Sequence, residues 1–327
     1  MISRSKCSCR IRILRILAIV LLGAVVVLEL VARFGLGLGD PPLFEADERI
    51  EYLAKPGKYR RFHNDVVYNQ YGMRSDPFGK TKDDPAEMRV MFIGDSVING
   101  GTLTDHRDLA TQTLKRELAD ALSTALVVGN ISAGSWGPPN QLAYLQRFGL
   151  FEADLLVVVI SSHDHVDVPT YEPAVDVEAA LPSRSPWLAI SEIPRYLPRI
   201  LSLGEPFSLP PRPKVELAKA GRSSMAALRQ IVQMAHAEGA SIIVGLHLEK
   251  SELGAGPKLP GYHQIRAFLA DLPVESVELG PAFEDALGQG RNPYRDQIHP
   301  NPLGQHLIAR TLFEPIRLRL AKPESGP

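Results

Sequence analysis

Apolar runs of strand length alternate with amphipathic stretches of helical length along most of the chain after residue 88. The runs contain few polar residues, as expected for strands buried on both faces of a parallel sheet. This alternation predicts an α/β domain whose parallel sheet is covered by helices on both faces. We expect strands at 90–93, 126–131, 155–160, 242–246 and 274–279, and helices at 108–123, 138–150, 223–237, 262–271 and 302–320.

The first 35 residues follow a different pattern. Five basic residues precede an unbroken apolar run at 16–28, and the apolar character continues past Glu29. This order is typical of an export signal or of a single membrane-spanning anchor. Because no Ala-x-Ala cleavage pattern follows, we favour a retained transmembrane helix with Glu29 near the interface. The basic end would then stay in the cytoplasm and the rest would be exported, to the periplasm or the cell exterior.

The chain therefore divides into three parts. Residues 1–35 form the basic tail and the anchor, and 36–87, rich in Pro, Gly and charged residues, are expected to be a stalk and a short pre-domain. Residues 88–322 form the α/β domain. Within it, 168–216 carry ten prolines interleaved with aromatic residues such as Trp187, Tyr196 and Phe207, which predicts an ordered excursion from the carboxyl end of the third strand. Such an excursion could shape a substrate cleft or be a plain insertion.

The composition argues against several classes of function. The 36 basic and 37 acidic residues give a net charge of -1, so no broad positive field favours a nucleic-acid partner. Cys7 and Cys9 are the two cysteines, and both precede the apolar run. The exported domain therefore has no thiol for a disulfide, a nucleophile or a metal site, and we expect no cofactor.

Two short segments carry residues for nucleophilic catalysis. Gly94-Asp95-Ser96 follows the first strand of the domain, and Asp296 and His299 lie in a loop before the last helix. A serine hydroxyl becomes a nucleophile when a histidine accepts its proton and a carboxylate orients that histidine. We therefore expect Ser96, His299 and Asp296 to form a triad at the carboxyl edge of the sheet.

Two further strands are expected to end at the same edge. The second strand is followed by Gly134, and the third by the polar stretch 161–164, which includes His163. Acyl transfer requires hydrogen-bond donors for the developing oxyanion, and backbone N–H groups or polar side chains can provide them. Gly134 and His163 are the candidates.

These four segments resemble the sequence blocks of the GDSL or SGNH hydrolases, over roughly residues 88–320. The resemblance implies a flavodoxin-like three-layer α/β/α sandwich and serine esterase, lipase or acyl-transfer activity. It also implies Ser96 as nucleophile, His299 as base, Asp296 as its partner, and an oxyanion hole that includes the backbone of Ser96 and Gly134. The chain departs from the family in its third block, where His163 replaces the asparagine that donates to the oxyanion.

Several functions fit these residues. The main expectation is a serine esterase acting on an acylated carbohydrate or lipid of the envelope, and an O-acyltransferase for an exported polysaccharide is an alternative. If 163–167 were extended, His163, His165 and Asp167 would point to one side and could bind a metal ion as in a metal-dependent hydrolase. A non-catalytic domain that binds a polymer is the fourth possibility.

Overall fold

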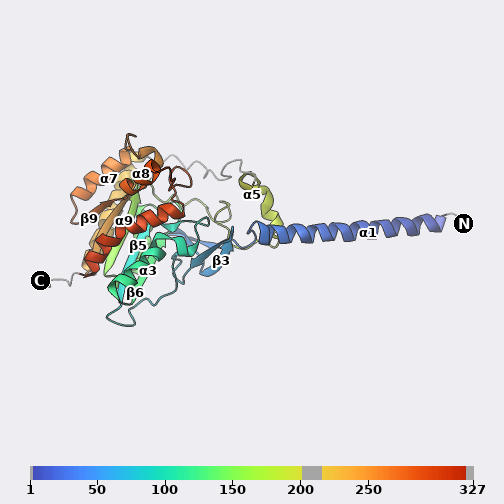
Figure 1. The fold of residues 1–327 in the computed structure, drawn as a ribbon, viewed down its shortest axis with the longest axis horizontal. Coiled ribbons are helices and arrows are strands. Elements are labelled where there is room, and N and C mark those ends of the chain that lie inside the picture. The colour runs from blue at the N-terminus through green and yellow to red at the C-terminus, as the bar shows by residue number, and fades with distance from the viewer. Residues whose placement is uncertain (1–2, 201–215, 322–327) are drawn as a thin grey trace.

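The computed structural model describes residues 3–200 and 216–321. Its centre is a five-stranded parallel sheet of order β6-β5-β7-β8-β9, so the second strand of the domain lies at one edge and the first lies beside it (Figure 1). This is the strand order of flavodoxin-like folds, in which ligands bind where the order reverses. The strands are β5 (Met88–Gly94), β6 (Leu126–Ser132), β7 (Leu155–Ser161), β8 (Ser241–His247) and β9 (Glu275–Glu278).

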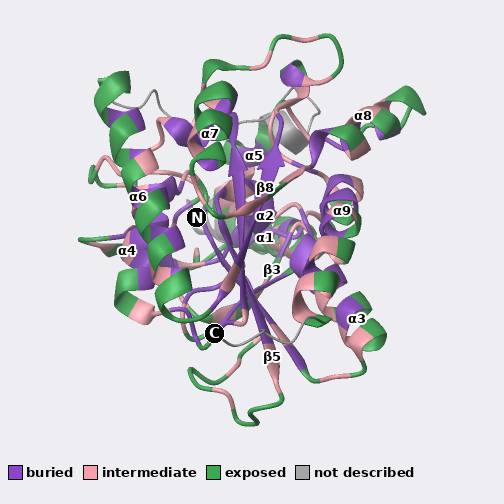
Figure 2. Cartoon of the chain, turned by 90° about the vertical axis from the view of Figure 1, so that its left-hand side faces the viewer, coloured by how far each residue is buried: buried purple, intermediate pink, exposed green. Residues whose placement is uncertain are grey.

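Helices cover both faces of the sheet and make three layers (Figure 2). One face packs against α4 (Pro138–Phe148), α6 (Leu217–Ala237) and α7 (Pro260–Ala270). The other packs against α3 (Ala110–Leu122), α8 (Gly280–Gly288) and α9 (Pro302–Ala321). The side chains of β7 are buried along its whole length, because apolar helix faces cover it on both sides. The predicted α/β/α architecture is confirmed.

Residues 36–87, where a stalk leading into a short strand or hairpin was expected, form two hairpins. Residues 36–87 contain β1 (Phe44–Asp47) paired with β2 (Glu51–Ala54), and β3 (Gly57–Arg61) paired with β4 (Asn64–Tyr68), both antiparallel. Their apolar side chains belong to the same buried cluster as one face of the sheet. This segment is therefore part of the folded domain, and a flexible stalk is not what separates the domain from the N-terminal helix.

The N-terminal helix α1 (Ser3–Leu30) continues as a π-helical turn, Val31–Gly35, and projects away from the domain (Figure 1). Among the described residues, Arg12–Gly35 is the one helical stretch long and apolar enough to cross a membrane, and most of its side chains are exposed, whereas Ala32 near its end is buried. The anchor predicted from the sequence is consistent with this helix.

The Pro-rich excursion is described up to residue 200, and its expected features at Pro206, Phe207, Pro210, Pro211 and Pro213 lie outside the described residues. The described part contains a 3-10 turn, Ala189–Glu192, and α5 (Ile193–Ile200). In Figure 1, α5 lies beside the domain-side end of α1. The stretch 187–196 therefore packs at the end of the N-terminal apolar helix, and the structure does not place it against the predicted triad.

Candidate active site

Ser96 is positioned by the turn from β5 into a short helix, α2 (Ser96–Asn99). Asp95 is the N-cap of this helix, and its Oδ1 accepts a hydrogen bond from the backbone N–H of Val97 at 2.9 Å. The preceding Gly94 allows a close approach of β7, because a Cβ there would lie 2.8 Å from the carbonyl oxygen of Val159. The turn therefore places the Ser96 hydroxyl at the carboxyl edge of the sheet.

Three buried amide side chains hold the backbone of α2. Asn99 donates to the carbonyl of Ser132 at 2.8 Å, which ties the end of α2 to the end of β6. Asn130 donates to the carbonyl of Ile98 at 2.9 Å. Gln305 of α9 donates to the carbonyl of Val97 at 2.7 Å. These residues were not predicted from the sequence, although an asparagine inside the apolar run of β6 is a signal of such a role.

The loop that carries Asp296 and His299 is held just as firmly. Asp296 Oδ1 accepts hydrogen bonds from the backbone N–H groups of Ile298 and His299, both at 2.8 Å. The buried His247, at the end of β8, has Nε2 at 3.0 Å from the carbonyl oxygen of Ile298. Burial lowers the pKa of His247 to about 4, so its ring is neutral and Nε2–H donates this bond.

These two segments bring the predicted triad together. His299 Nε2 lies 2.9 Å from Ser96 Oγ, and His299 Nδ1 lies 2.7 Å from Asp296 Oδ2. Burial alone would raise the pKa of Asp296, but hydrogen bonds from the ring and the backbone of His299 keep it well below its usual value. Asp296 is therefore ionised near neutral pH and stabilises an imidazolium at His299. About a third of each side chain is exposed, so substrate can reach the pair.

His163 contacts the turn that carries Ser96. Its Nε2 is 2.9 Å from Asp95 Oδ2, and its Nδ1 is 3.5 Å from Glu249 Oε1. Burial alone would lower the pKa of His163, but the nearby Asp164 and the hydrogen bond to Asp95 raise it well above its usual value. Both ring nitrogens of this imidazolium face carboxylates. The ring was expected to donate a hydrogen bond to an oxyanion, and its orientation here is different.

Gly134 lies where the chain leaves β6, and the Tyr52 hydroxyl donates a hydrogen bond to its carbonyl oxygen. Tyr52 belongs to β2, so the N-terminal hairpin supports the loop of an expected oxyanion donor. This contact could not be predicted, because nothing in the local pattern of 36–87 indicates that the hairpin packs on the β6–α4 loop.

The structure does not form the metal site considered from the sequence. Residues Ser162–His165 form a 3-10 helix with three residues per turn, so the side chains of His163 and His165 leave the backbone in different directions. His165 packs against Gly221 of α6 instead. Among the described residues, the group with metal-ligand atoms within 4.8 Å of one another is Asp95, His163 and Asp164. In that group, Asp95 Oδ2 and His163 Nε2 are hydrogen-bonded to each other. These two atoms would have to give up that bond to bind an ion.

Gly261, near the start of α7, sets how closely that helix packs against the 3-10 helix that carries His163. A Cβ at this position would lie 1.9 Å from the carbonyl oxygen of Ser162. We expect Gly261→Ala to lower the free energy of unfolding by about 1–3 kcal/mol, because the two backbones must separate. Denaturant titration measures the change. Gly288→Ala is the matched control, since a Cβ at Gly288 in α8 meets nothing within 4 Å. Equal stabilities of the two variants would contradict the packing argument.

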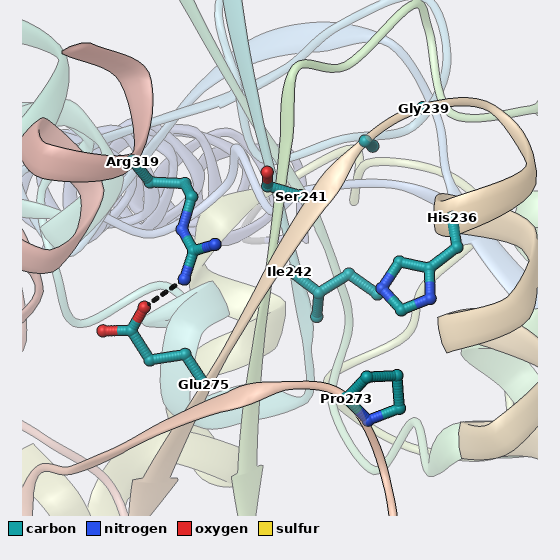
Figure 3. Close-up of a pocket in the computed structure, with 8 residues that line it drawn as sticks. His236, Gly239, Ser241, Ile242, Pro273, Glu275 and Arg319 are labelled. Atoms are coloured by element: carbon teal, nitrogen blue, oxygen red, sulfur yellow. Dashed lines mark hydrogen bonds and ion pairs between the residues drawn. The ribbon is translucent and has the colours of Figure 1, made fainter. Parts of the chain in front are cut away.

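A hollow of about 340 Å³ lies at the opposite edge of the sheet (Figure 3). It is lined by His236, Ser241 at the start of β8, and an ion pair between Glu275 and Arg319 at 2.5 Å. The amino ends of the strands meet at this edge, whereas the triad lies at the carboxyl ends. The hollow is therefore separate from the triad.

Comparison with known proteins gives distant structural likenesses. No family model and no curated protein matches the chain. A lipolytic protein of the G-D-S-L family from Veillonella parvula is similar at 12% identity and a TM-score of 0.44, over 69% of this chain and 97% of that one. An acetylxylan esterase from Geobacillus stearothermophilus is similar at 13% identity and a TM-score of 0.44, over 70% and 94% of the two chains. An α/β hydrolase enzyme from the metagenome of Lake Arreo in Spain is similar at 16% identity and a TM-score of 0.45, over 72% and 97%.

Proposed function

We propose that this protein is a serine esterase that removes ester-linked acyl groups from a carbohydrate or lipid of the cell envelope. The hydrogen-bonded chain Ser96–His299–Asp296 carries the proposal, with heavy-atom distances of 2.9 and 2.7 Å. These distances lie within the range for proton transfer between a nucleophile, its base and an orienting group. A domain that only binds a polymer has no physical need for this arrangement.

The acylation step follows from the geometry. Ser96 Oγ attacks the ester carbonyl carbon while His299 Nε2 accepts the hydroxyl proton, and Asp296 stabilises the imidazolium through Nδ1–H. The tetrahedral intermediate collapses when His299 returns the proton to the departing alcohol oxygen. The product is an acyl-enzyme at Ser96. In the second step His299 deprotonates a water molecule, which attacks the acyl carbon, and the carboxylic acid leaves as Ser96 recovers its proton.

The proposed oxyanion donors are the backbone N–H groups of Ser96 and Gly134. Ser96 is the first residue of α2, where a backbone N–H has no partner within the helix, and Asp95 caps the next N–H at Val97. The Tyr52 bond to the Gly134 carbonyl orients the peptide groups of that loop. His163 was expected to be the third oxyanion donor. We assign it a different role, in which its positive charge holds the Asp95 carboxylate in place.

The location of the substrate is inferred from the N-terminal helix. We infer that Arg12–Gly35 spans a membrane with its basic flank in the cytoplasm, and that the esterase domain is exported. The domain would then meet esters at the outer surface of that membrane. The Asp296–His299 pair, about a third exposed at an open sheet edge, suits an acyl group presented on a larger molecule.

The full chain in detergent micelles tests this function. We expect it to hydrolyse an aryl acetate and to release acetate from acetylated oligosaccharides, with Ser96→Ala inactive on both. Ser276→Ala, which alters an exposed serine of β9, should keep full activity. Adding an unacetylated sugar as acceptor distinguishes an O-acyltransferase, which would form the sugar ester faster than free acetate. Equal rates for the wild-type chain and Ser96→Ala would refute the proposal.

A further inference from the structure

Residues 187–197 of the excursion, here called the collar, contact the last turns of the N-terminal helix. The Glu29 carboxylate accepts hydrogen bonds from the backbone N–H groups of Ala189 at 3.0 Å and Ile190 at 3.1 Å. Glu29 also pairs with Arg33 one turn later, and Arg33 donates to the carbonyl oxygen of Trp187 at 3.4 Å. A carboxylate near the end of an apolar helix therefore has bonding partners from a segment about 160 residues away.

A second set of contacts fixes the collar to the domain. Arg61 of β3 is buried and donates two hydrogen bonds of 2.7 Å to Glu192, a planar bidentate pair. Its guanidinium lies 4.6 Å from the ring centre of Phe62 and 4.8 Å from that of Tyr196. Glu192 also accepts the backbone N–H of Gly39 at 2.7 Å. The collar is therefore a joint between the membrane helix and the catalytic domain.

The outer side of this joint is apolar and exposed. Trp187 is 97% exposed, and Leu188 and Leu197 are 46% and 43% exposed. Phe34 is exposed in the last turn of the stretch Arg12–Gly35. These four side chains lie where the apolar helix ends, and Figure 1 shows α5 of the collar beside that end. In water, so much exposed apolar surface is unfavourable, whereas indole and phenyl rings are favoured at the boundary between lipid tails and headgroups.

We propose that the collar lies in the lipid headgroup region, with the Trp187 ring inserted beside Phe34, and thereby holds the catalytic domain at a fixed height above the bilayer. The occupant of the apolar patch is lipid because the patch is continuous with the membrane-spanning helix. The proposal rests on the inferred membrane span and not on the esterase activity, so the two can fail separately.

The tryptophans of this chain make the proposal measurable. Trp187 and Trp136 are the two tryptophans, and Trp136 is only 1% exposed in the domain core. Trp136→Phe leaves Trp187 as the single fluorophore, and it removes an indole N–H that has no hydrogen-bond partner among the described residues. Trp187→Phe is the matched control, with Trp136 as the fluorophore.

Each full-length variant is reconstituted in phosphatidylcholine vesicles that contain a lipid with a shallow spin label. We expect this lipid to quench Trp187 and not Trp136, and water-soluble acrylamide to have little effect on either. Adding Glu29→Ala should reduce the lipid quenching of Trp187, with hydrolysis of a soluble aryl ester unchanged. Free access of acrylamide to Trp187 without lipid quenching would overturn the proposal. Protection of Trp187 from both quenchers would also overturn it, because a protein surface would then cover the patch.

Discussion

Ser96→Ala and His299→Ala are each expected to lower kcat for ester hydrolysis by about 10⁴- to 10⁶-fold. Without the hydroxyl no acyl-enzyme forms, and without the imidazole nothing accepts the proton that Ser96 Oγ now shares with Nε2 at 2.9 Å. Because the groups act as a unit, the double variant should be little slower than either single variant. Initial rates with an aryl acetate measure all three.

Asp296→Asn tests the residue that orients His299 in the proposed triad. The amide keeps the size of the side chain but stabilises neither the positive charge nor the correct tautomer of His299, so kcat is expected to fall by about 10⁴-fold. Circular dichroism should show that each variant is folded. A folded His299→Ala protein with the wild-type rate would rule out the proposed base.

The largest loss of stability is expected for Asp95→Ala. This change leaves the His163 imidazolium without its 2.9 Å partner and removes the cap from the Val97 N–H. Breaking a buried ion pair from one side costs about 3–5 kcal/mol, and losing a helix cap adds about 1 kcal/mol. Denaturant titration of the full chain in detergent measures the free energy of unfolding. Asp84→Ala is the control, because Asp84 is an exposed carboxylate that caps only the Ala86 N–H, at 2.8 Å.

The pH dependence of this stability difference follows from two pKa shifts. Burial would raise the pKa of Asp95, but the His163 hydrogen bond lowers it below 3.8, so its contribution is present above 3.8 and lost as pH falls through the lowered value. The pKa of His163 is raised above 6.5, so its contribution is present below 6.5 and lost as pH rises through the raised value. The difference in the free energy of unfolding between wild type and Asp95→Ala should therefore be largest between pH 3.8 and pH 6.5. A difference that does not vary with pH would contradict the ion pair.

Much of the α/β domain could be predicted from its sequence because its signals are local. Buried parallel strands appear as apolar runs, and all five predicted strands occur within two residues of their expected limits. The triad was also predictable, since Ser96 follows a strand and Asp296 and His299 lie close enough to meet within one loop. Helix α8 was missed because its nine residues directly follow β9 and offer little periodic pattern.

Contacts between distant segments were beyond prediction. Residues 36–87 are rich in turn-forming and charged residues, and only the folded chain shows that Tyr52 bonds to the loop of Gly134. The alternative metal site depended on an extended backbone at 163–167, whereas Asp164 caps the backbone N–H of Ser161 at 2.7 Å at the start of a 3-10 helix. The sequence left open whether the excursion shapes a substrate cleft or is a plain insertion, and only the partners of Glu29 and Glu192 place the collar at the end of the N-terminal helix.

Covalent labelling of the nucleophile tests the central claim most directly. A fluorophosphonate reacts with a serine whose hydroxyl is activated by a general base. Digestion and mass spectrometry of the labelled full chain then locate the adduct. We expect a single adduct at Ser96 that is absent in Ser96→Ala and forms far more slowly in His299→Ala. An adduct at another serine, or labelling of His299→Ala at the wild-type rate, would contradict the assignment of Ser96 and His299 as nucleophile and base.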